Sequence, residues 1–222
     1  MSDLLKVIEE LLKYYRFDSN EFVATKSLRD GLHPLGILVS IILSQNTSDK
    51  NALRALSNLR RRLGMRLEPN DFRGIDVKEI EDLIRPSGMY RLKARAIINV
   101  VKRFSGNNDL MELEPSKLRE ELLSIPGVGP KTADVFLLMV RKYPTFPIDT
   151  HIRRVLTRLG FIEPNTQYEA IREHVMKSLP PNLYLPAHLV LIKHGRTICR
   201  ARGPKCDVCP ISRYCKYFRE NR

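Results

Sequence analysis

The sequence predicts an all-α protein, and three observations lead to this fold class. Apolar residues recur every three or four positions along most of the chain, as they do on the buried face of a helix. No segment alternates apolar and polar residues in the way that would indicate a strand. Prolines stand at the joints between the periodic segments. With 222 residues, the chain is long enough to bury a core, in one large or two small domains.

The apolar pattern places the helices in order. The apolar run of 35–43 is too short to span a bilayer, so we expect a buried helix there. Asp49 precedes the next helix, and its expected apolar stripe is Leu53, Leu56, Leu59 and Leu63. Pro115 and Pro130 suit first helical positions, and Asp149 suits an N-cap. We expect helices over 1–15, 35–43, 50–63, 77–84, 92–104, 116–124, 131–142, 150–159, 168–178 and 186–193.

The charge of the chain indicates a polyanionic partner. Lys and Arg number 38 against 25 Asp and Glu, which gives a formal net charge of +13. Nucleic acid is the first candidate partner and an anionic membrane surface the second, while a basic surface without a partner is the alternative. Because the first 15 residues do not resemble a signal or transit peptide, we expect an intracellular protein.

All four cysteines lie in the last 24 residues, in the pattern Cys-x6-Cys-x2-Cys-x5-Cys. Four thiols so close together indicate ligands of one metal centre, either zinc or an iron–sulfur cluster. Two disulfides are the alternative, but they require an oxidising compartment. The spacing alone favours zinc, because it matches neither of the common ferredoxin patterns. The expected ligands are Cys199, Cys206, Cys209 and Cys215.

The segment 122–140 reads LLSIPGVGPKTADVFLLMV and predicts two helices joined by a tight turn. The turn residues are Gly127, Val128 and Gly129. Two glycines allow the backbone to approach a ligand closely, and the second helix directs its N–H groups and positive dipole end the same way. On a basic protein the natural anion for such a site is a DNA phosphate. An ordinary connection between two helices is the alternative.

Further motifs surround this turn. Ile148-Asp149-Thr150-His151-Ile152 follows it, then His194-Gly195-Arg196 and the four cysteines, while 43–49 reads LSQNTSD and 88–94 reads GMYRLKA. In this order the motifs resemble endonuclease III, the iron–sulfur branch of the helix-hairpin-helix DNA glycosylases, over about residues 28–218.

The resemblance implies two helical subdomains that flank a DNA-binding groove. A six-helix module would span 28–143 and contain the helix-hairpin-helix at 122–141. An iron–sulfur module would combine 1–27 with 144–222, with its cluster loop at 199–215. The family places a 4Fe–4S cluster on cysteines spaced in this way, so the resemblance replaces zinc by iron–sulfur. The cluster loop is also basic, and it would present Arg200, Arg202 and Lys205 to DNA phosphates. A loop that only stabilises the fold is the alternative, and both roles can coexist.

Lys131 matches the lysine that defines the bifunctional members of the family. A lysine must lose its proton to act as a nucleophile, and the positive end of a helix disfavours the ammonium. Monofunctional relatives that excise mispaired adenine or thymine carry other residues here. Asp149 matches the family's catalytic carboxylate, which would stabilise positive charge as the base departs and help to deprotonate the lysine. The alternatives are a phosphate-binding lysine and an ordinary N-cap.

Base excision requires that the damaged nucleotide leave the duplex, and the resemblance indicates which residues would fill the gap. Asn46 lies where the family inserts a polar amide, with Gln45 beside it, and Met89 lies where a leucine wedge is common. Asn is shorter than the usual Gln, and Met is of similar volume to Leu but flexible. Pro130 stands where a basic residue is common, so phosphate contacts would rely on Gly127 and Gly129. The alternative for Met89 is an ordinary core residue.

The sequence therefore predicts a bifunctional DNA glycosylase and abasic-site lyase that removes oxidised pyrimidines from duplex DNA. It would contain a 4Fe–4S cluster and act as a monomer on double-stranded DNA with damaged bases, without a membrane partner. A mismatch-directed uracil or thymine glycosylase of the same fold is one alternative. A non-catalytic DNA-binding iron–sulfur protein is another, and the presence of both Lys131 and Asp149 argues against it.

Overall fold

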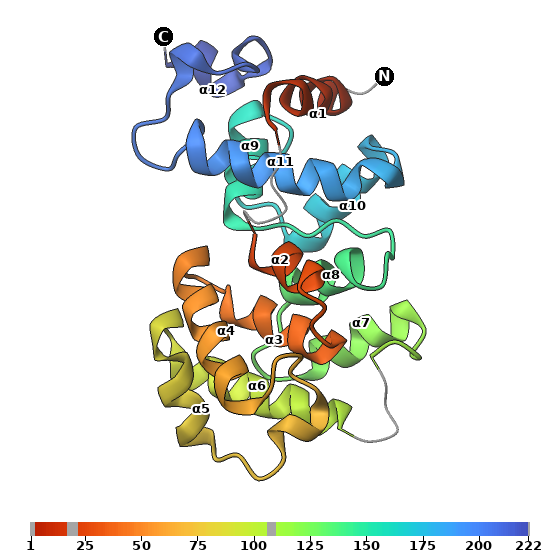
Figure 1. Ribbon diagram of the computed structural model, residues 1–222. Coiled ribbons are helices and arrows are strands. Elements are labelled where there is room, and N and C mark those ends of the chain that lie inside the picture. The colour runs from red at the N-terminus through yellow and green to blue at the C-terminus, as the bar shows by residue number, and fades with distance from the viewer. Residues whose placement is uncertain (1–2, 17–21, 106–109, 222) are drawn as a thin grey trace. The chain divides into compact units, whose positions relative to one another are not determined.

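The computed structural model describes residues 3–16, 22–105 and 110–221, and these residues form helices, short 3-10 turns and loops, with no strand among them. The all-α prediction is confirmed. The chain divides into two compact units (Figure 1). We call residues 18–143 the central unit, and residues 1–17 together with 144–222 the terminal unit. None of the described helices is both long enough and apolar enough to cross a membrane.

The helices of the central unit are α2 (Val23–Arg29), α3 (Pro34–Leu43), α4 (Asp49–Leu63), α5 (Val77–Ile84), α6 (Tyr90–Phe104), α7 (Pro115–Ser124) and α8 (Pro130–Met139). Those of the terminal unit are α1 (Asp3–Tyr14), α9 (Thr150–Leu159), α10 (Tyr168–Ser178), α11 (Tyr184–Thr197) and α12 (Lys216–Glu220). Five 3-10 turns connect them: η1 (Pro69–Phe72), η2 (Arg85–Ser87), η3 (Pro181–Leu183), η4 (Cys206–Val208) and η5 (Ser212–Tyr214).

Helix α3 forms the core of the central unit. Every residue from Leu35 to Leu43 is buried, and the helix contacts α2, α4, α6 and α8. The prediction of a buried helix is therefore confirmed. Gly36 allows this packing, since a Cβ there would lie 2.7 Å from the Arg66 carbonyl oxygen. A helix that is apolar on all sides needs such neighbours around its whole circumference.

The buried face of α4 differs from the expected leucine stripe. Its buried residues are Ala52, Ala55, Leu56 and Leu59, whereas Leu53 and Leu63 are only partly buried. The two alanines lie on the buried face because their small side chains allow neighbouring helices to approach closely. The N-cap is Ser48, whose hydroxyl oxygen accepts a bond of 3.3 Å from the Asn51 amide.

The terminal unit joins segments from both ends of the sequence. Helix α1 buries Leu4, Val7, Ile8 and Leu11 and contacts α10 and α11. Helix α9 packs on α11 at Gly195, where a Cβ would lie 2.8 Å from the His151 Cβ. The glycine of the His-Gly-Arg motif is therefore required for close helix packing.

Several boundaries differ from the sequence-based expectation. Helix α2 packs against α3 and α4 and lies in the central unit, although residues 1–27 were expected in the iron–sulfur module. Helix α8 ends at Met139 rather than at the expected residue 142. Lys142 has a positive φ of 53°, which is not a helical conformation. Helix α11 extends beyond the expected 186–193 at both ends, and α12 was not predicted.

Candidate active site and metal centre

The glycine turn between α7 and α8 is built on the surface of α6. Gly127 has a φ of +95°, and a Cβ on it would lie 2.5 Å from the Ala96 Cβ. Val128 is buried and anchors the turn. Gly129 has an ordinary φ of −95°, and a Cβ on it would meet no atom within 4 Å. The first glycine is thus required by packing, whereas the second leaves an open surface at the helix start.

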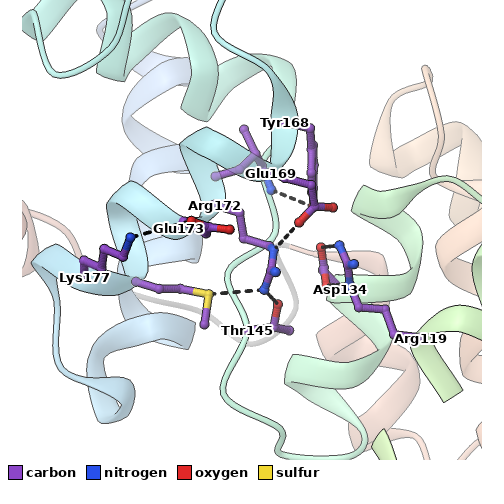
Figure 2. Close-up of polar contacts among 10 residues, drawn as sticks. Arg119, Asp134, Thr145, Tyr168, Glu169, Arg172, Glu173 and Lys177 are labelled. Carbon is purple, nitrogen blue, oxygen red and sulfur yellow. Dashed lines mark hydrogen bonds and ion pairs between the residues drawn. The ribbon is translucent and has the colours of Figure 1, made fainter. Parts of the chain in front are cut away.

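Polar contacts fix this turn on both sides. The Gln45 Nε2 donates to the Gly127 carbonyl oxygen at 3.2 Å and to the Thr132 Oγ1 at 3.0 Å. The buried Asp134 carboxylate of α8 pairs with the Arg119 guanidinium of α7 through bonds of 2.8 and 3.1 Å (Figure 2). This bidentate pair holds the two helices in one orientation. The Gln45 amide supports the turn, and its contact with DNA stays a prediction.

Lys131 lies in the first turn of α8, next to Pro130, and is half-buried. The first backbone N–H groups of a helix have no intrahelical acceptor, and they carry its positive dipole end. Lys131 belongs to the central unit, and Asp149 belongs to the terminal unit.

Asp149 is the N-cap of α9, as predicted, and its Oδ1 accepts a 2.7 Å bond from the Ile152 amide. The segment before it is held by side chains around α10 and α11. The Arg172 guanidinium donates to the Thr145 Oγ1 at 3.2 Å, and the Ile148 amide donates to the Tyr168 hydroxyl at 3.3 Å (Figure 2). The His188 Nδ1 lies 3.1 Å from the Pro147 carbonyl oxygen. These contacts fix the backbone of the segment 145–148, which leads directly to Asp149.

His151 is a neutral neighbour of this carboxylate. The Arg154 Nη2 lies 3.1 Å from the His151 Nδ1, and because a guanidinium only donates, that nitrogen accepts. The proton of the neutral ring therefore sits on Nε2. Burial lowers the pKa of His151, which agrees with a neutral imidazole. Arg154 also donates to the carbonyl oxygens of Gly195 at 2.8 Å and Cys199 at 3.0 Å, and so connects α9 to the first cysteine.

Asn46 and Met89 form an exposed pair on the central unit. The Asn46 Nδ2 lies 3.8 Å from the Met89 Sδ, and both residues adopt left-handed backbone conformations, with φ of 48° and 47°. Met89 is 50% exposed, which differs from the alternative of an ordinary core residue. Whether this pair contacts DNA stays a prediction.

The four cysteines line one pocket together with apolar side chains that include Val155, Leu159, Ile198 and Phe218. Burial raises the pKa of Cys209 to about 11 and also raises the pKa of Cys215, and the neighbouring thiols add to both effects. Four deprotonated thiols in such a pocket need compensating positive charge, which metal ions supply. In the described part of the chain, no three His, Cys, Asp or Glu residues surround a single ion position. Cys199, Cys206, Cys209 and Cys215 are the residues that would hold a metal centre here.

Residues to which sequence analysis assigned no role lie beside two of these thiols. The Arg158 Nη1 lies 3.4 Å from the Cys199 Sγ, and the guanidinium also lies 4.7 Å from the centre of the Tyr217 ring. The buried His194 places its Nε2 3.7 Å from the Cys209 Sγ, and the Tyr15 hydroxyl lies 3.1 Å from its Nδ1. Arg154 and Arg158 are four residues apart on one face of α9, a signal that sequence analysis could have used.

The segment between the first two cysteines exposes its cations. Arg200, Arg202 and Lys205 are all exposed. The loop is closed by bonds from the amides of Arg200 and Lys205 to the Ile198 carbonyl oxygen, and Gly203 turns it with a φ of +58°. The loop thus has a defined shape, and its contact with phosphate stays a prediction.

The all-helical fold, the glycine turn and the lysine after it characterise one class of protein. Residues 39–181 match the sequence profile of the HhH-GPD superfamily of base excision DNA repair proteins, and the chain belongs to this family.

Individual relatives agree with this assignment. The chain is 39% identical over 212 residues to endonuclease III of Sulfolobus acidocaldarius, which covers 96% of this chain and 95% of the relative. A solved non-covalent endonuclease III–DNA complex matches with a TM-score of 0.80 and 26% identity, and covers 98% of this chain and 95% of that one. A trapped endonuclease III–DNA covalent intermediate matches with a TM-score of 0.75 and 26% identity, and covers 92% and 99%.

Proposed function

We propose that this protein is a bifunctional DNA glycosylase and abasic-site lyase that removes oxidised pyrimidines from duplex DNA. The observation that carries the proposal is Lys131 in the first turn of α8, directly after the glycine turn, in a chain of the HhH-GPD superfamily. A covalent DNA intermediate has been trapped for the related endonuclease III, which supports a nucleophilic route.

In the proposed reaction, the neutral Lys131 amine attacks C1′ of the damaged nucleotide. The bond from C1′ to the base breaks, and the base departs with the bonding electrons. The sugar opens to an imine between Lys131 and C1′, which acidifies the C2′ proton. Loss of that proton expels the 3′ phosphate and breaks the strand, and water then releases the lysine.

Asp149 has the electrostatic part in this proposal. Positive charge develops on the sugar as the base departs, and a fixed carboxylate stabilises it at little cost in reorganisation. The Asp149 carboxylate is held by the Ile152 amide and by the segment 145–148 before it. The same carboxylate is proposed to help remove the proton from Lys131.

DNA engagement is proposed for three surfaces. The turn of Gly127, Val128 and Gly129 binds a phosphate through backbone amides, where the open space at Gly129 admits the ligand. The cations Arg200, Arg202 and Lys205 bind further phosphates. Asn46 and Met89 enter the duplex, with Gln45 holding the turn beside them.

We also propose that Cys199, Cys206, Cys209 and Cys215 hold a 4Fe–4S cluster. The cluster would supply the cationic centre that lets four thiolates share one apolar pocket. Purified protein should be yellow-brown, with about four iron and four sulfide per chain as the cluster formula requires. A colourless protein with one stoichiometric zinc would contradict the cluster. Replacing any of the four cysteines by alanine should destabilise the terminal unit, because the remaining ligands leave the coordination incomplete.

Borohydride trapping tests the nucleophile. Wild-type protein should be linked covalently to a duplex with an oxidised pyrimidine, and Lys131→Gln should not be linked while it retains most of its DNA affinity. Lys117→Gln on α7 is the matched control, because it removes the same charge from an exposed position of the same unit. Trapping that persists in Lys131→Gln would move the nucleophile elsewhere.

A panel of duplexes with single defined lesions decides between the remaining alternatives. Excision of oxidised pyrimidines supports the proposed substrate class. Excision confined to uracil or thymine opposite guanine would instead identify a mismatch-directed enzyme. Tight binding without excision of any lesion would identify a non-catalytic DNA-binding protein.

A further inference from the structure

Lys93 is a buried lysine that the proposed reaction does not use. It lies on α6 and is 2% exposed. Its Nζ donates to the Leu43 carbonyl oxygen at 2.9 Å and to the Ser87 carbonyl oxygen at 2.7 Å. Lysine is seldom buried, because removing an ammonium from water is costly unless hydrogen bonds replace the lost hydration. Hydrogen bonds from the buried ammonium to the surrounding backbone therefore have to stabilise this charge.

Both carbonyl groups that accept from the Lys93 ammonium lie at helix ends. Leu43 is the last residue of α3, and Ser87 is the last residue of the 3-10 turn η2. Carbonyl groups at the end of a helix lack intrahelical donors and carry its negative partial charge. One ammonium satisfies both carbonyls. Burial lowers the pKa of Lys93 to about 8, so the ammonium remains the main form at neutral pH.

Each of these helix ends leads directly to one of the exposed residues described above. Asn46 follows Leu43 by three positions, and Met89 follows Ser87 by two. The left-handed backbone of each residue costs on the order of 1 kcal/mol and persists only where surrounding contacts enforce it. The Lys93 amide also donates to the Met89 carbonyl oxygen at 3.1 Å, so main chain and side chain of one residue hold the same loop.

We infer that Lys93 is a positioning residue that holds the loops of Asn46 and Met89 together as a preformed wedge for the duplex. The inference rests on the proposed function, in which these two residues enter the DNA. The ammonium itself is buried and acts only through the two loops. Loops that are ordered in advance lose less conformational entropy when they insert, so flipping of a stable base pair is favoured.

Two rate constants measured on each variant test this inference. Lys93→Met removes the ammonium but keeps an unbranched side chain of similar length, and Lys93→Gln serves as a second substitution. Lys102→Met is the matched control, because it removes the same charge from an exposed position of the same helix. Single-turnover excision is measured on a lesion in a stable pair and on the same lesion in an unpaired bubble.

Both Lys93 variants should lose about tenfold or more on the paired lesion and only a few-fold on the bubble, since the wedge matters most where pairing must be broken. The ratio of the two rate constants does not depend on the folded fraction, because unfolded protein lowers both equally. Equal losses on the two substrates, or a wild-type ratio, would overturn the inference.

A flipping assay separates this inference from the proposed chemistry. The duplex carries 2-aminopurine opposite a tetrahydrofuran abasic analogue. The fluorescence of 2-aminopurine rises when a wedge displaces it from the base stack. Wild type and Lys102→Met should raise the fluorescence, and Lys93→Met should raise it less at saturating protein. If wild type excises no lesion, the proposed function fails while this result still decides the role of Lys93. An equal rise in all three proteins would overturn the inference.

Discussion

Single side chains in this protein combine a structural contact with a proposed chemical one. Asp149 caps α9 through the Ile152 amide and is also the proposed stabiliser of the departing base. Lys93 satisfies two carbonyl groups and is also the proposed support of the wedge. Substitutions that remove one of these two properties and keep the other can test each role separately.

Asp149→Asn separates capping from charge. Asparagine caps a helix about as well as aspartate, so the free energy of unfolding should change by less than about 0.5 kcal/mol. Excision should fall on the order of a hundredfold, because the amide carries no charge to stabilise the transition state. Denaturant unfolding and single-turnover excision measure the two effects. Asp149→Ala should in addition lose about 1 kcal/mol of stability with the cap. Near-normal excision by Asp149→Asn would leave only the capping role.

The Lys93 ammonium should make stability depend on pH. Burial lowers its folded-state pKa to about 8 from the ordinary 10.5, so the unfolded chain binds a proton that the folded chain does not between these values. Stability should therefore rise with pH in this window, by about 2 kcal/mol between about pH 7 and pH 9.5. Urea unfolding of wild type and Lys93→Met measures the difference, in which other titrating groups cancel. Parallel pH profiles for the two proteins would contradict the shift.

At the scale of elements, the turn between α7 and α8 shows why two glycines in one motif are not equivalent. Gly127 is confined by its positive φ and by Ala96, whereas Gly129 has ordinary backbone dihedrals and open space around it. The sequence predicted the turn and both helices, because proline and glycine mark such joints. It did not predict which glycine supports the fold, since that depends on a contact with α6.

Alanine at Gly127 should mainly affect stability, whereas alanine at Gly129 should mainly affect DNA binding. Gly127→Ala should lower stability by about 2 kcal/mol or more, because the new Cβ meets Ala96 in a strained backbone conformation. Gly129→Ala should cost less than about 1 kcal/mol but should weaken binding to duplexes of any sequence, because its methyl group stands where the phosphate is proposed to bind. Thermal unfolding and fluorescence anisotropy measure the two outcomes. Unchanged DNA affinity in Gly129→Ala would argue against the turn as a phosphate site.

Helix prediction succeeded where apolar spacing and end signals agreed. The structure confirms the cap at Asp149 and the ranges of α5 and α10, and α9 begins and ends as expected. Helix α2 was missed because its N-cap, Phe22, has no side-chain oxygen to mark a helix start. The buried role of Lys93 was missed because a lysine on an amphipathic helix ordinarily faces water. Only the folded chain brings the ends of α3 and η2 to its side chain.

At the scale of the whole molecule, the net charge of +13 should dominate nonspecific DNA binding. The logarithm of the binding constant should fall linearly with the logarithm of salt concentration, as it does when bound phosphates release counterions. Replacing Arg200, Arg202 and Lys205 together by glutamine should reduce the slope by about 2 to 3.

The matched control for this measurement is replacement of Lys6, Lys13 and Lys177 by glutamine. These three lysines lie in the same unit and pair with carboxylates within the chain. Their removal changes the net charge equally but should leave the slope nearly unchanged. A slope that responds equally to both sets would indicate that overall charge, rather than the loop between the cysteines, binds phosphate.

The terminal unit also has a consequence for biosynthesis. Helix α1 leaves the ribosome before the whole central unit, whereas its partner helices α10 and α11 are translated after that unit. Domains generally fold as units during synthesis, so the central unit can begin to bury its core while the apolar face of α1 still lacks its partner. The nascent chain therefore carries an exposed amphipathic helix until α10 and α11 have been translated. Ribosomes that stall between α8 and α11 would release chains with this helix uncovered, and such chains are natural clients for chaperones.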